Sequence, residues 1–216
     1  MVARDLAQGV AWCEATLGVT PGPGGEHPLM GTHNRLIKIA TAEHRTTYLE
    51  IIAINPVAIP SIPTRASRWF DMDDPALQAR VAQHGPALVH WIAGVPDIAA
   101  AVATLAAQGI DRGAVIQASR PTPAGLLQWQ ISVRADGQRL FDGCLPTLIQ
   151  WGSTHPTDAM ADSGISLRSL QVQHPQAMAL NTAYQTLGLP PMARVSETAR
   201  LSVQLQTPKG LVDIQS

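Results

Sequence analysis

The stretch LVHWIAGVPDIAAAVATLAAQGI, residues 88–110, decides the fold of this chain. Its first part, 88–95, is an apolar run of strand length, and Asp97 is a residue type that caps helix N-termini. Large apolar side chains then recur with helical spacing, at Ile98, Val102 and Leu105. Gly109 marks the end of the helix. We therefore predict a buried strand followed by an amphipathic helix.

The beginning of the chain, MVARDLAQGVAWCEATLG, repeats the helical part of this unit. DLAQGVA (5–11) matches DIAAAVA (97–103), and Gly18 stands where Gly109 ends the second copy. The first copy lacks the leading strand, because its cap residue Asp5 comes almost at once after Met1. We predict a gap or an exposed sheet edge there. Any intact active site would have to be completed by upstream residues, a partner chain or the third repeat.

Strand-like segments follow each helix, and a weaker third copy comes later in the chain. The expected strands are 34–40, 46–55, 113–120, 126–135, 145–152, 165–173, 199–206 and 211–215, and the further helices are 76–83 and 177–188. Repeats of this length also occur in solenoids, but mixed strand–helix–strand units favour an α+β fold of paired βαβββ modules. We expect paired modules over 1–156 (module one 1–55, linker 56–86 with its proline-rich stretch, module two 87–152) and a third βα unit over 157–216, packed on the same domain.

Composition excludes several classes of protein. The net charge is −1, only two lysines occur and no basic run is present, which argues against a nucleic-acid partner. No apolar run approaches the ~20 residues of a membrane span. Charged residues make up only 14%, which favours a homodimer with a buried partner surface. Two cysteines, Cys13 and Cys144, are too few for a disulfide scaffold, so we expect a cytoplasmic protein with free thiols.

The polar stretch GPGGEHPLMGTHNRL, residues 22–36, is the first candidate site. It matches no phosphate-loop motif, and an ordinary turn before a strand is one interpretation. The other is a wall of a binding pocket, since glycines permit close approach of backbone to a ligand. On that interpretation a loop histidine, His33, transfers protons, and the ligand-binding residues are His27, Gly31, Thr32 and Asn34.

Glu50 is a more specific candidate for a functional residue. In TTYLEIIAIN, strand alternation places it among apolar side chains together with Tyr48. Burying an acid is costly unless it is paired, protonated or bound to metal, although an edge strand facing solvent would also accommodate it. His90 lies in the run 88–95 and is either a hydrogen-bonded core histidine or a ligand that meets Glu50 across a shared cavity. Gln150 sits late in the last strand of module two, much as Glu50 does in module one. Trp129 is a further candidate for ligand contact.

The stretch GPGGEHPLMGTHNRL, followed by TTYLEIIAINP, resembles the signature of a glyoxalase-like domain family in the vicinal oxygen chelate superfamily (glyoxalase/bleomycin resistance/dihydroxybiphenyl dioxygenase). HWIAGVPDI (90–98) and LPTLIQWGSTHP (145–156) support the resemblance. It implies curled mixed sheets that form a cup, with Glu50, His90 and Gln150 at positions that hold a divalent metal (Zn, Ni, Mn or Fe). The histidine expected on the first strand of module one has no counterpart.

Three functions follow as hypotheses. The first is a metal-dependent lyase, isomerase or dioxygenase acting on a small oxygen-rich substrate, with Glu50 and His33 moving protons. The second is a non-catalytic protein of the bleomycin-resistance type that binds a small molecule in the cup. The third is an interaction domain with a vestigial cup. Bound metal that is lost in Glu50→Ala and His90→Ala would distinguish the first from the others.

Overall fold

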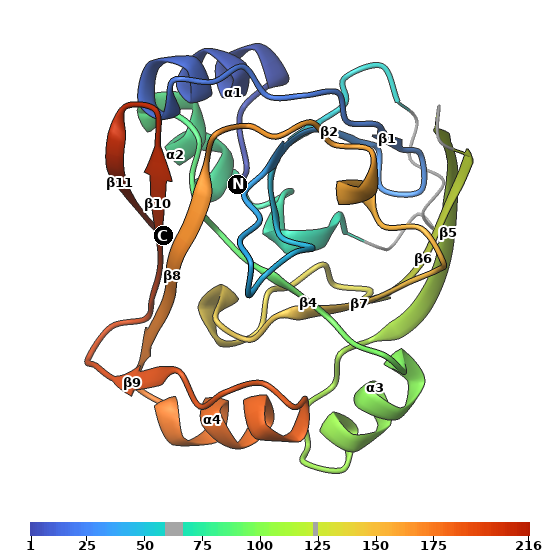
Figure 1. Cartoon of the computed structure of the whole chain (residues 1–216). Coiled ribbons are helices and arrows are strands. Elements are labelled where there is room, and N and C mark those ends of the chain that lie inside the picture. Colours follow the sequence, from blue (N-terminus) through green and yellow to red (C-terminus); the bar gives the residue numbers. More distant parts are fainter. Residues whose placement is uncertain (59–66, 123–124) are drawn as a thin grey trace.

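The computed structural model describes residues 1–58, 67–122 and 125–216, and there the chain forms three β-sheets and four α-helices (Figure 1). The proline-rich stretch 59–66 of the expected linker lies outside these residues. The helices are α1 (Leu6–Trp12), α2 (Pro75–His84), α3 (Ile98–Ala106) and α4 (Ala177–Thr186). Of the described helices, none is long and apolar enough to cross a membrane.

The first sheet is an antiparallel ladder in the order β1–β2–β3, with α1 packed on its second and third strands. Its strands are β1 (Glu26–His27), β2 (Thr32–Lys38) and β3 (Tyr48–Ile54). In β3 the alternation expected from the sequence places Tyr48, Glu50 and Ile52 on one face. A short loop ended by Gly31, which has a positive φ of 60°, connects β1 to β2.

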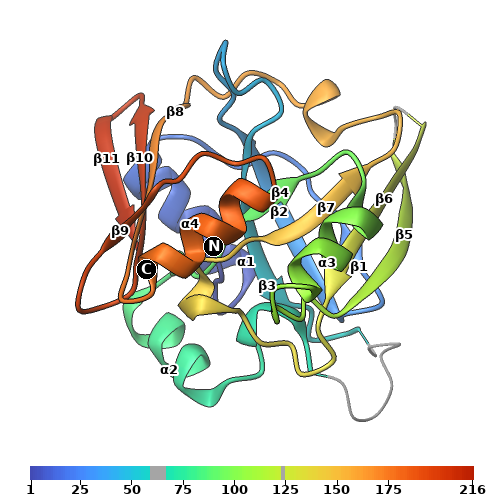
Figure 2. The ribbon, with the colours of Figure 1, turned by 90° about the horizontal axis from the view of Figure 1, so that it is seen from below.

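The second sheet has the order β4–β7–β6–β5 and curls toward the first (Figure 2). Its strands are β4 (Ile92–Gly94), β5 (Ala114–Thr122), β6 (Gly125–Val133) and β7 (Thr147–Trp151). β4 runs parallel to β7, whereas the other neighbours are antiparallel. α3 packs on β6 and β7 as α1 packs on β2 and β3, so the two units repeat the same layers.

The third unit adds a sheet in the order β11–β10–β8–β9 and the helix α4, which packs against α3 and β9. Its strands are β8 (Ser166–His174), β9 (Ala193–Val195), β10 (Arg200–Thr207) and β11 (Gly210–Gln215). One apolar core joins all three units, with Leu17, Leu148 and Leu201 each fully buried in it. The buried hydroxyl of Tyr184 donates to the Cys144 carbonyl at 2.7 Å, which ties α4 to the second unit.

The aspartate caps are confirmed in both copies. The Asp5 side chain accepts the Gln8 N–H group and the Asp97 side chain accepts that of Ala100. One difference between the copies has a packing reason, because a Cβ at Gly9 would overlap Ile51 of β3. Gly9 stands where the second copy has Ala101. α1 therefore lies closer to its sheet than an alanine at this position would allow.

The segment Met1–Ala3 occupies the place of the strand that the first copy lacks. Val2 is fully buried and forms a parallel bridge with Ile52 and an antiparallel bridge with Ala87. Ala3 N–H donates to the Ile52 carbonyl, and Ile52 N–H donates to that of Met1, both at 2.9 Å. The leading strand is thus reduced to a bridge, but the prediction of an exposed edge at this point was wrong, since Ala87, the first residue of module two, covers it.

The strand expected over 88–95 is shorter, because β4 contains only Ile92–Gly94. The Thr147 N–H group donates to the His90 ring at 3.0 Å and to the Trp91 carbonyl at 3.3 Å, so a side chain shares this donor with the backbone. The Val89 carbonyl accepts from the Arg139 guanidinium at 2.8 Å. Side-chain hydrogen bonds thus compete with the ladder before Ile92, and His90 precedes the strand.

Candidate functional site

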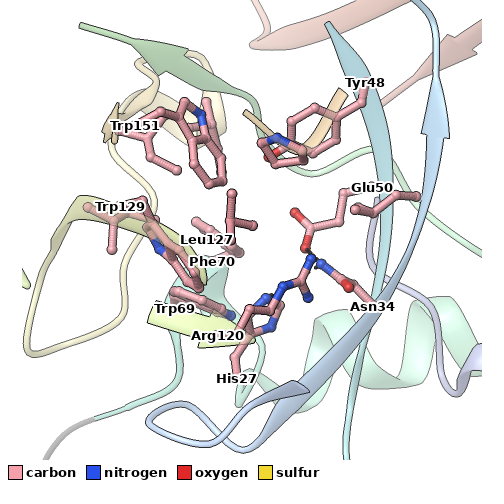
Figure 3. Close-up of a pocket in the computed structure, with 15 residues that line it drawn as sticks. His27, Asn34, Tyr48, Glu50, Trp69, Phe70, Arg120, Leu127, Trp129 and Trp151 are labelled. Carbon is pink, nitrogen blue, oxygen red and sulfur yellow. Dashed lines mark hydrogen bonds between the residues drawn. The ribbon is translucent and has the colours of Figure 1, made fainter. Parts of the chain in front are cut away.

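A pocket of about 40 Å³ lies between the first and second sheets, and we call it the Glu50 pocket (Figure 3). Its polar side chains are His27, Asn34, Tyr48, Glu50 and Arg120. Its apolar wall is rich in aromatic side chains and contains Trp69, Phe70, Leu127, Trp129 and Trp151. The pocket thus combines a carboxylate, a guanidinium and an imidazole within an aromatic enclosure.

Asn34 holds the Glu50 carboxylate in place. Its Nδ2 donates to Glu50 Oε1 at 2.5 Å, and its Oδ1 accepts the Gly25 N–H group at 2.7 Å. The two bonds fix the orientation of the amide, because only Nδ2 is a donor and only Oδ1 an acceptor. Asn34 and Glu50 come from β2 and β3 and face the pocket from neighbouring strands. The second carboxylate oxygen, Oε2, has no such partner among the described residues, which leaves it available to a ligand.

His27 extends this network. Its Nδ1 lies 3.1 Å from Thr32 Oγ1, and its Nε2 lies 3.5 Å from Asn34 Nδ2. Since Asn34 Nδ2 is a donor, Nε2 is the acceptor and Nδ1 carries the proton toward Thr32. Burial lowers the pKa of His27, while Glu50 raises it and Arg120 lowers it further. His27 is therefore neutral at pH 7, and its ring meets Trp69 edge-on at 5.1 Å between centroids.

Arg120 brings a positive charge to the pocket from β5 in the opposite sheet. Its guanidinium points toward Glu50 and Asn34 (Figure 3). Two buried donors of the pocket residues, Arg120 Nη1 and Trp69 Nε1, have no hydrogen-bond acceptor within the part of the chain that the structure describes. Buried donors are costly to leave unpaired, so these atoms favour a ligand with anionic or carbonyl oxygens.

Gly25 is needed for the position of Arg120, because a Cβ at Gly25 would overlap the guanidinium. We predict that Gly25→Ala displaces Arg120 and weakens the binding of an anionic ligand about 10-fold, the loss of one charge-assisted hydrogen bond. The thermal unfolding temperature should change little, since the long arginine side chain can move away. For a ligand that occupies only the Glu50 pocket, Gly94→Ala is the matched control, because Gly94 does not line this pocket and nothing lies within 4 Å of a Cβ there. Equal affinities for both variants would contradict the prediction.

The aromatic wall depends on an uncommon backbone turn. Phe70 and Asp71 both have positive φ angles, 61° and 56°, which non-glycine residues rarely adopt. The Asp71 carboxylate accepts from Arg139 Nε at 2.7 Å, and Asp71 N–H donates to the Gly137 carbonyl at 3.0 Å. These contacts hold Phe70 against Trp69, with ring centroids 5.2 Å apart. The second unit therefore supports a wall residue that precedes it in the sequence.

The structure brings together five of the residues that the sequence predicted as site residues: His27, Asn34, Tyr48, Glu50 and Trp129. Thr32 stands behind them and bonds the His27 ring. Gly31 ends the β1–β2 loop, and its carbonyl accepts the Asn55 N–H group at 2.9 Å. His33 is next to Asn34 on β2, so strand alternation turns it away from the pocket, of which it is not a lining residue.

The three predicted metal ligands do not converge on one point. The Gln150 side chain accepts the Ile98 N–H group at 2.9 Å, on the face of β7 opposite to Ile149 and Trp151. Strand pairing also aligns the last strand of module one with that of module two differently from the sequence analysis, which had matched Glu50 with Gln150. Val2 faces Ile52 as Gly94 faces Ile149, so Thr147, not Gln150, is the counterpart of Glu50.

Both ring nitrogens of His90 are already bonded. Nδ1 lies 2.9 Å from the Gly143 carbonyl, and Nε2 accepts from Thr147. Within residues 1–58, 67–122 and 125–216, no group of three or more histidine, cysteine, aspartate or glutamate side chains is placed to hold a metal ion. The cation of Arg120 next to Glu50 is also unfavourable for a dication. The residues present do not fit the metal that the resemblance implies.

His90 makes stability depend on pH. Burial, together with the charge of Arg112, lowers the pKa of His90 to about 3, whereas a histidine in an unfolded chain titrates near about 6.5. Between these values only the unfolded state binds the proton, so the free energy of unfolding falls as the pH falls through this window. Between about pH 6 and about pH 5, the free energy of unfolding of the wild type should fall by about 1 kcal/mol more than that of His90→Asn. Urea unfolding at both pH values measures this difference. The exposed His44→Asn variant should behave as wild type.

Arg120, Trp69 and Trp151 line the Glu50 pocket but were not among the site residues predicted from the sequence. The available signal for Arg120 was a charged residue in a strand-like run, GAVIQASR, which belongs to a different unit from Glu50. Trp69 and Phe70 lie in the expected linker, where no periodicity marks them as pocket residues. Pairing across two sheets is a tertiary property that spacing along the chain does not report.

Two repeated units, two curled sheets and a pocket between them thus define the class of fold to which this chain belongs. The model of one family, the glyoxalase-like domain, matches residues 1–188, and the chain belongs to this family. The sequence matches no curated protein.

Solved structures with similar folds have low sequence identity. Methylmalonyl-CoA epimerase of Streptomyces coelicolor is 17% identical, with 71% of this chain and 92% of that chain covered and a TM-score of 0.42. 4-Hydroxymandelate synthase of the same organism is 13% identical, with coverage of 99% and 60% and a TM-score of 0.44. Glyoxalase I of Zea mays is 17% identical, with coverage of 69% and 43% and a TM-score of 0.21.

Proposed function

We propose that this protein is an enzyme of the lyase or isomerase type that moves a proton on a small oxygen-rich carboxylate, with Glu50 as the base. The observation that carries the proposal is the Glu50 carboxylate, oriented through Oε1 by Asn34 and with Oε2 open to the pocket. A base must be fixed within hydrogen-bond reach of the proton it removes, and this network supplies that fixation.

The remaining polar groups suit the charge that such a reaction creates. Removal of a proton next to a carbonyl leaves an enolate, and its negative oxygen needs donors or a cation. Arg120 Nη1 and Trp69 Nε1 are buried donors without acceptors among the described residues. Neutral His27 lies beside them. A substrate with adjacent carboxylate and keto oxygens, as in an α-keto acid, matches this set.

The step is balanced without a further reactant. The Glu50 carboxylate takes the proton from the carbon next to the keto group. The electron pair of that C–H bond forms the C=C bond of the enolate, and the π pair of the keto group moves onto its oxygen. Return of a proton from the Glu50 carboxylic acid to the same carbon re-forms the keto group and completes the exchange. A divalent metal is not part of this proposal, because the expected ligands do not meet at one point.

Deuterium exchange tests the proposal with α-ketobutyrate and phenylpyruvate as probes. We expect the protein in deuterium oxide to accelerate loss of the proton signal next to the keto group above the buffer rate, as followed by NMR. The same samples should be treated with a chelator, which we expect to leave the rate unchanged. No acceleration with either probe would contradict the proposed reaction.

A non-catalytic binding protein is the second candidate. The observation that favours it is the tryptophan wall, in which Trp129 and Trp151 lie 5.7 Å apart between centroids and can contact a flat ligand without reaction. Quenching of tryptophan fluorescence by phenylpyruvate without any deuterium exchange would support this candidate over the enzyme.

A further inference from the structure

A second and larger cavity, of about 330 Å³, lies next to the Glu50 pocket, and we call it the apolar chamber. The two share Tyr48, Glu50, Phe70 and Trp151 on their border. A group attached to a substrate bound at Glu50 therefore has the chamber as the next space open to it. A cavity of ~150 Å³ holds one benzene molecule, and the chamber has about twice this volume. It can therefore accommodate an apolar group of about ten carbon atoms.

The third unit closes the chamber. Leu167 and Leu170 of β8 and Val203 of β10 form its far wall. Residues three apart on a regular strand face opposite sides, but the pairing of β8 with β10 shifts register between Ser169 and Leu167. This bulge turns both leucines to the same side. Val203 lies beyond the residues that the family model matches, whereas Leu167 and Leu170 lie within them.

Several polar groups also reach the chamber. Tyr48 and Glu50 lie on its border with the Glu50 pocket, and the Met1 ammonium donates to the Glu50 carbonyl at 2.6 Å. Both His90 nitrogens are used within the protein, so its ring contributes an apolar face. Thr46 is exposed, and His155 Nδ1 lies 2.7 Å from Thr157 Oγ1. The rest of the lining is largely aliphatic and aromatic, with Leu88, Trp91 and Ile149 among its members. Such a surface selects an apolar group by excluding water from it.

We propose that the apolar chamber binds the alkyl or aryl tail of the substrate, so that the protein acts on amphipathic α-keto acids of medium chain length. This inference rests on the proposed function for the identity of the polar head. The chamber selects the tail, and the Glu50 pocket holds the head.

Binding of a homologous series tests the inference separately from the reaction. The probes are α-ketobutyrate, α-ketohexanoate, α-keto-octanoate and α-ketodecanoate, with affinity measured by calorimetry. For the wild type we expect the dissociation constant to fall about 4-fold for each added methylene until the chamber is full, the value for burial of a CH₂ group. An affinity that does not change with chain length would overturn the inference.

Leu170→Trp should fill the chamber and remove the dependence on chain length, while the affinity for α-ketobutyrate stays within about 3-fold of wild type. Gln171→Trp is the matched control on the same strand, because Gln171 is exposed, and it should keep the dependence. Leu170→Ala enlarges the chamber, so the chain length that binds most tightly should increase. This variant tests the same assignment if Leu170→Trp does not fold. Unchanged profiles in both Leu170 variants would contradict the assignment.

The two proposals fail in different ways. If deuterium exchange is absent but affinity rises with chain length and Leu170→Trp removes the rise, the chamber is a binding site and the proposed reaction is wrong. If exchange occurs equally with every chain length and affinity is flat, the reaction stands and the chamber does not bind the tail.

Discussion

Glu50→Gln is expected to slow deuterium exchange into α-keto acids by about 10³-fold, while their affinity stays within a few-fold of wild type. Glutamine keeps the size of the side chain and a carbonyl oxygen that accepts from Asn34 Nδ2, but its amide does not take up a proton. The expected loss therefore falls on the rate constant and not on binding. NMR exchange rates at saturating α-ketobutyrate, together with calorimetry, measure the two effects separately.

Glu26→Gln is the matched control, since it removes the same charge from an exposed position on β1. It should leave both exchange and affinity unchanged. A Glu50→Gln variant that exchanges deuterium as fast as wild type would show that another group is the base. A variant that binds poorly as well would indicate that Glu50 serves mainly to shape the pocket.

Arg120→Met is expected to weaken the binding of α-ketobutyrate about 50-fold, because a hydrogen bond between charged groups contributes about 1.5–3 kcal/mol. Methionine retains much of the apolar stem of arginine and removes only the guanidinium. Removing this cation leaves the Glu50 carboxylate to repel an anionic ligand, which adds to the loss. Calorimetric titration at low and moderate salt measures the effect.

Arg35→Met controls for the change in net charge, because Arg35 is exposed on β2 and is not among the residues that line the Glu50 pocket. Its affinity should match that of wild type at moderate salt, where distant surface charges are screened. Equal losses in both variants would mean that Arg120 acts through general attraction of anions and makes no direct contact.

The family resemblance and the order of elements could be predicted from the sequence because they rest on local signals. Asp5 and Asp97 cap their helices as the pattern predicts, since a cap depends on a few neighbouring residues. The alternation in β3 correctly placed Glu50 and Tyr48 on one face. These features need only the period of a helix or strand, which the chain carries along its length.

The composition of the site was decided by tertiary structure. Gln150 was aligned with Glu50 by its place in a strand, but strand pairing shifted the alignment and turned its side chain to the other face of β7. A shift of one residue in register reverses every side chain, and no local signal marks it. His90 was placed among the candidate ligands by its neighbours, whereas its partners Gly143 and Thr147 lie far along the chain.

The sequence by itself thus determined the repeated units, their caps and the acid on the first sheet. Only the tertiary structure placed Arg120 of the second sheet opposite that acid, closed the edge at Val2 with Ala87, and covered the apolar chamber with Leu170 and Val203. The physical reason is the range of the interactions. Caps and periodicity act within a few residues, while a pocket between sheets depends on packing and register between segments far apart in the chain.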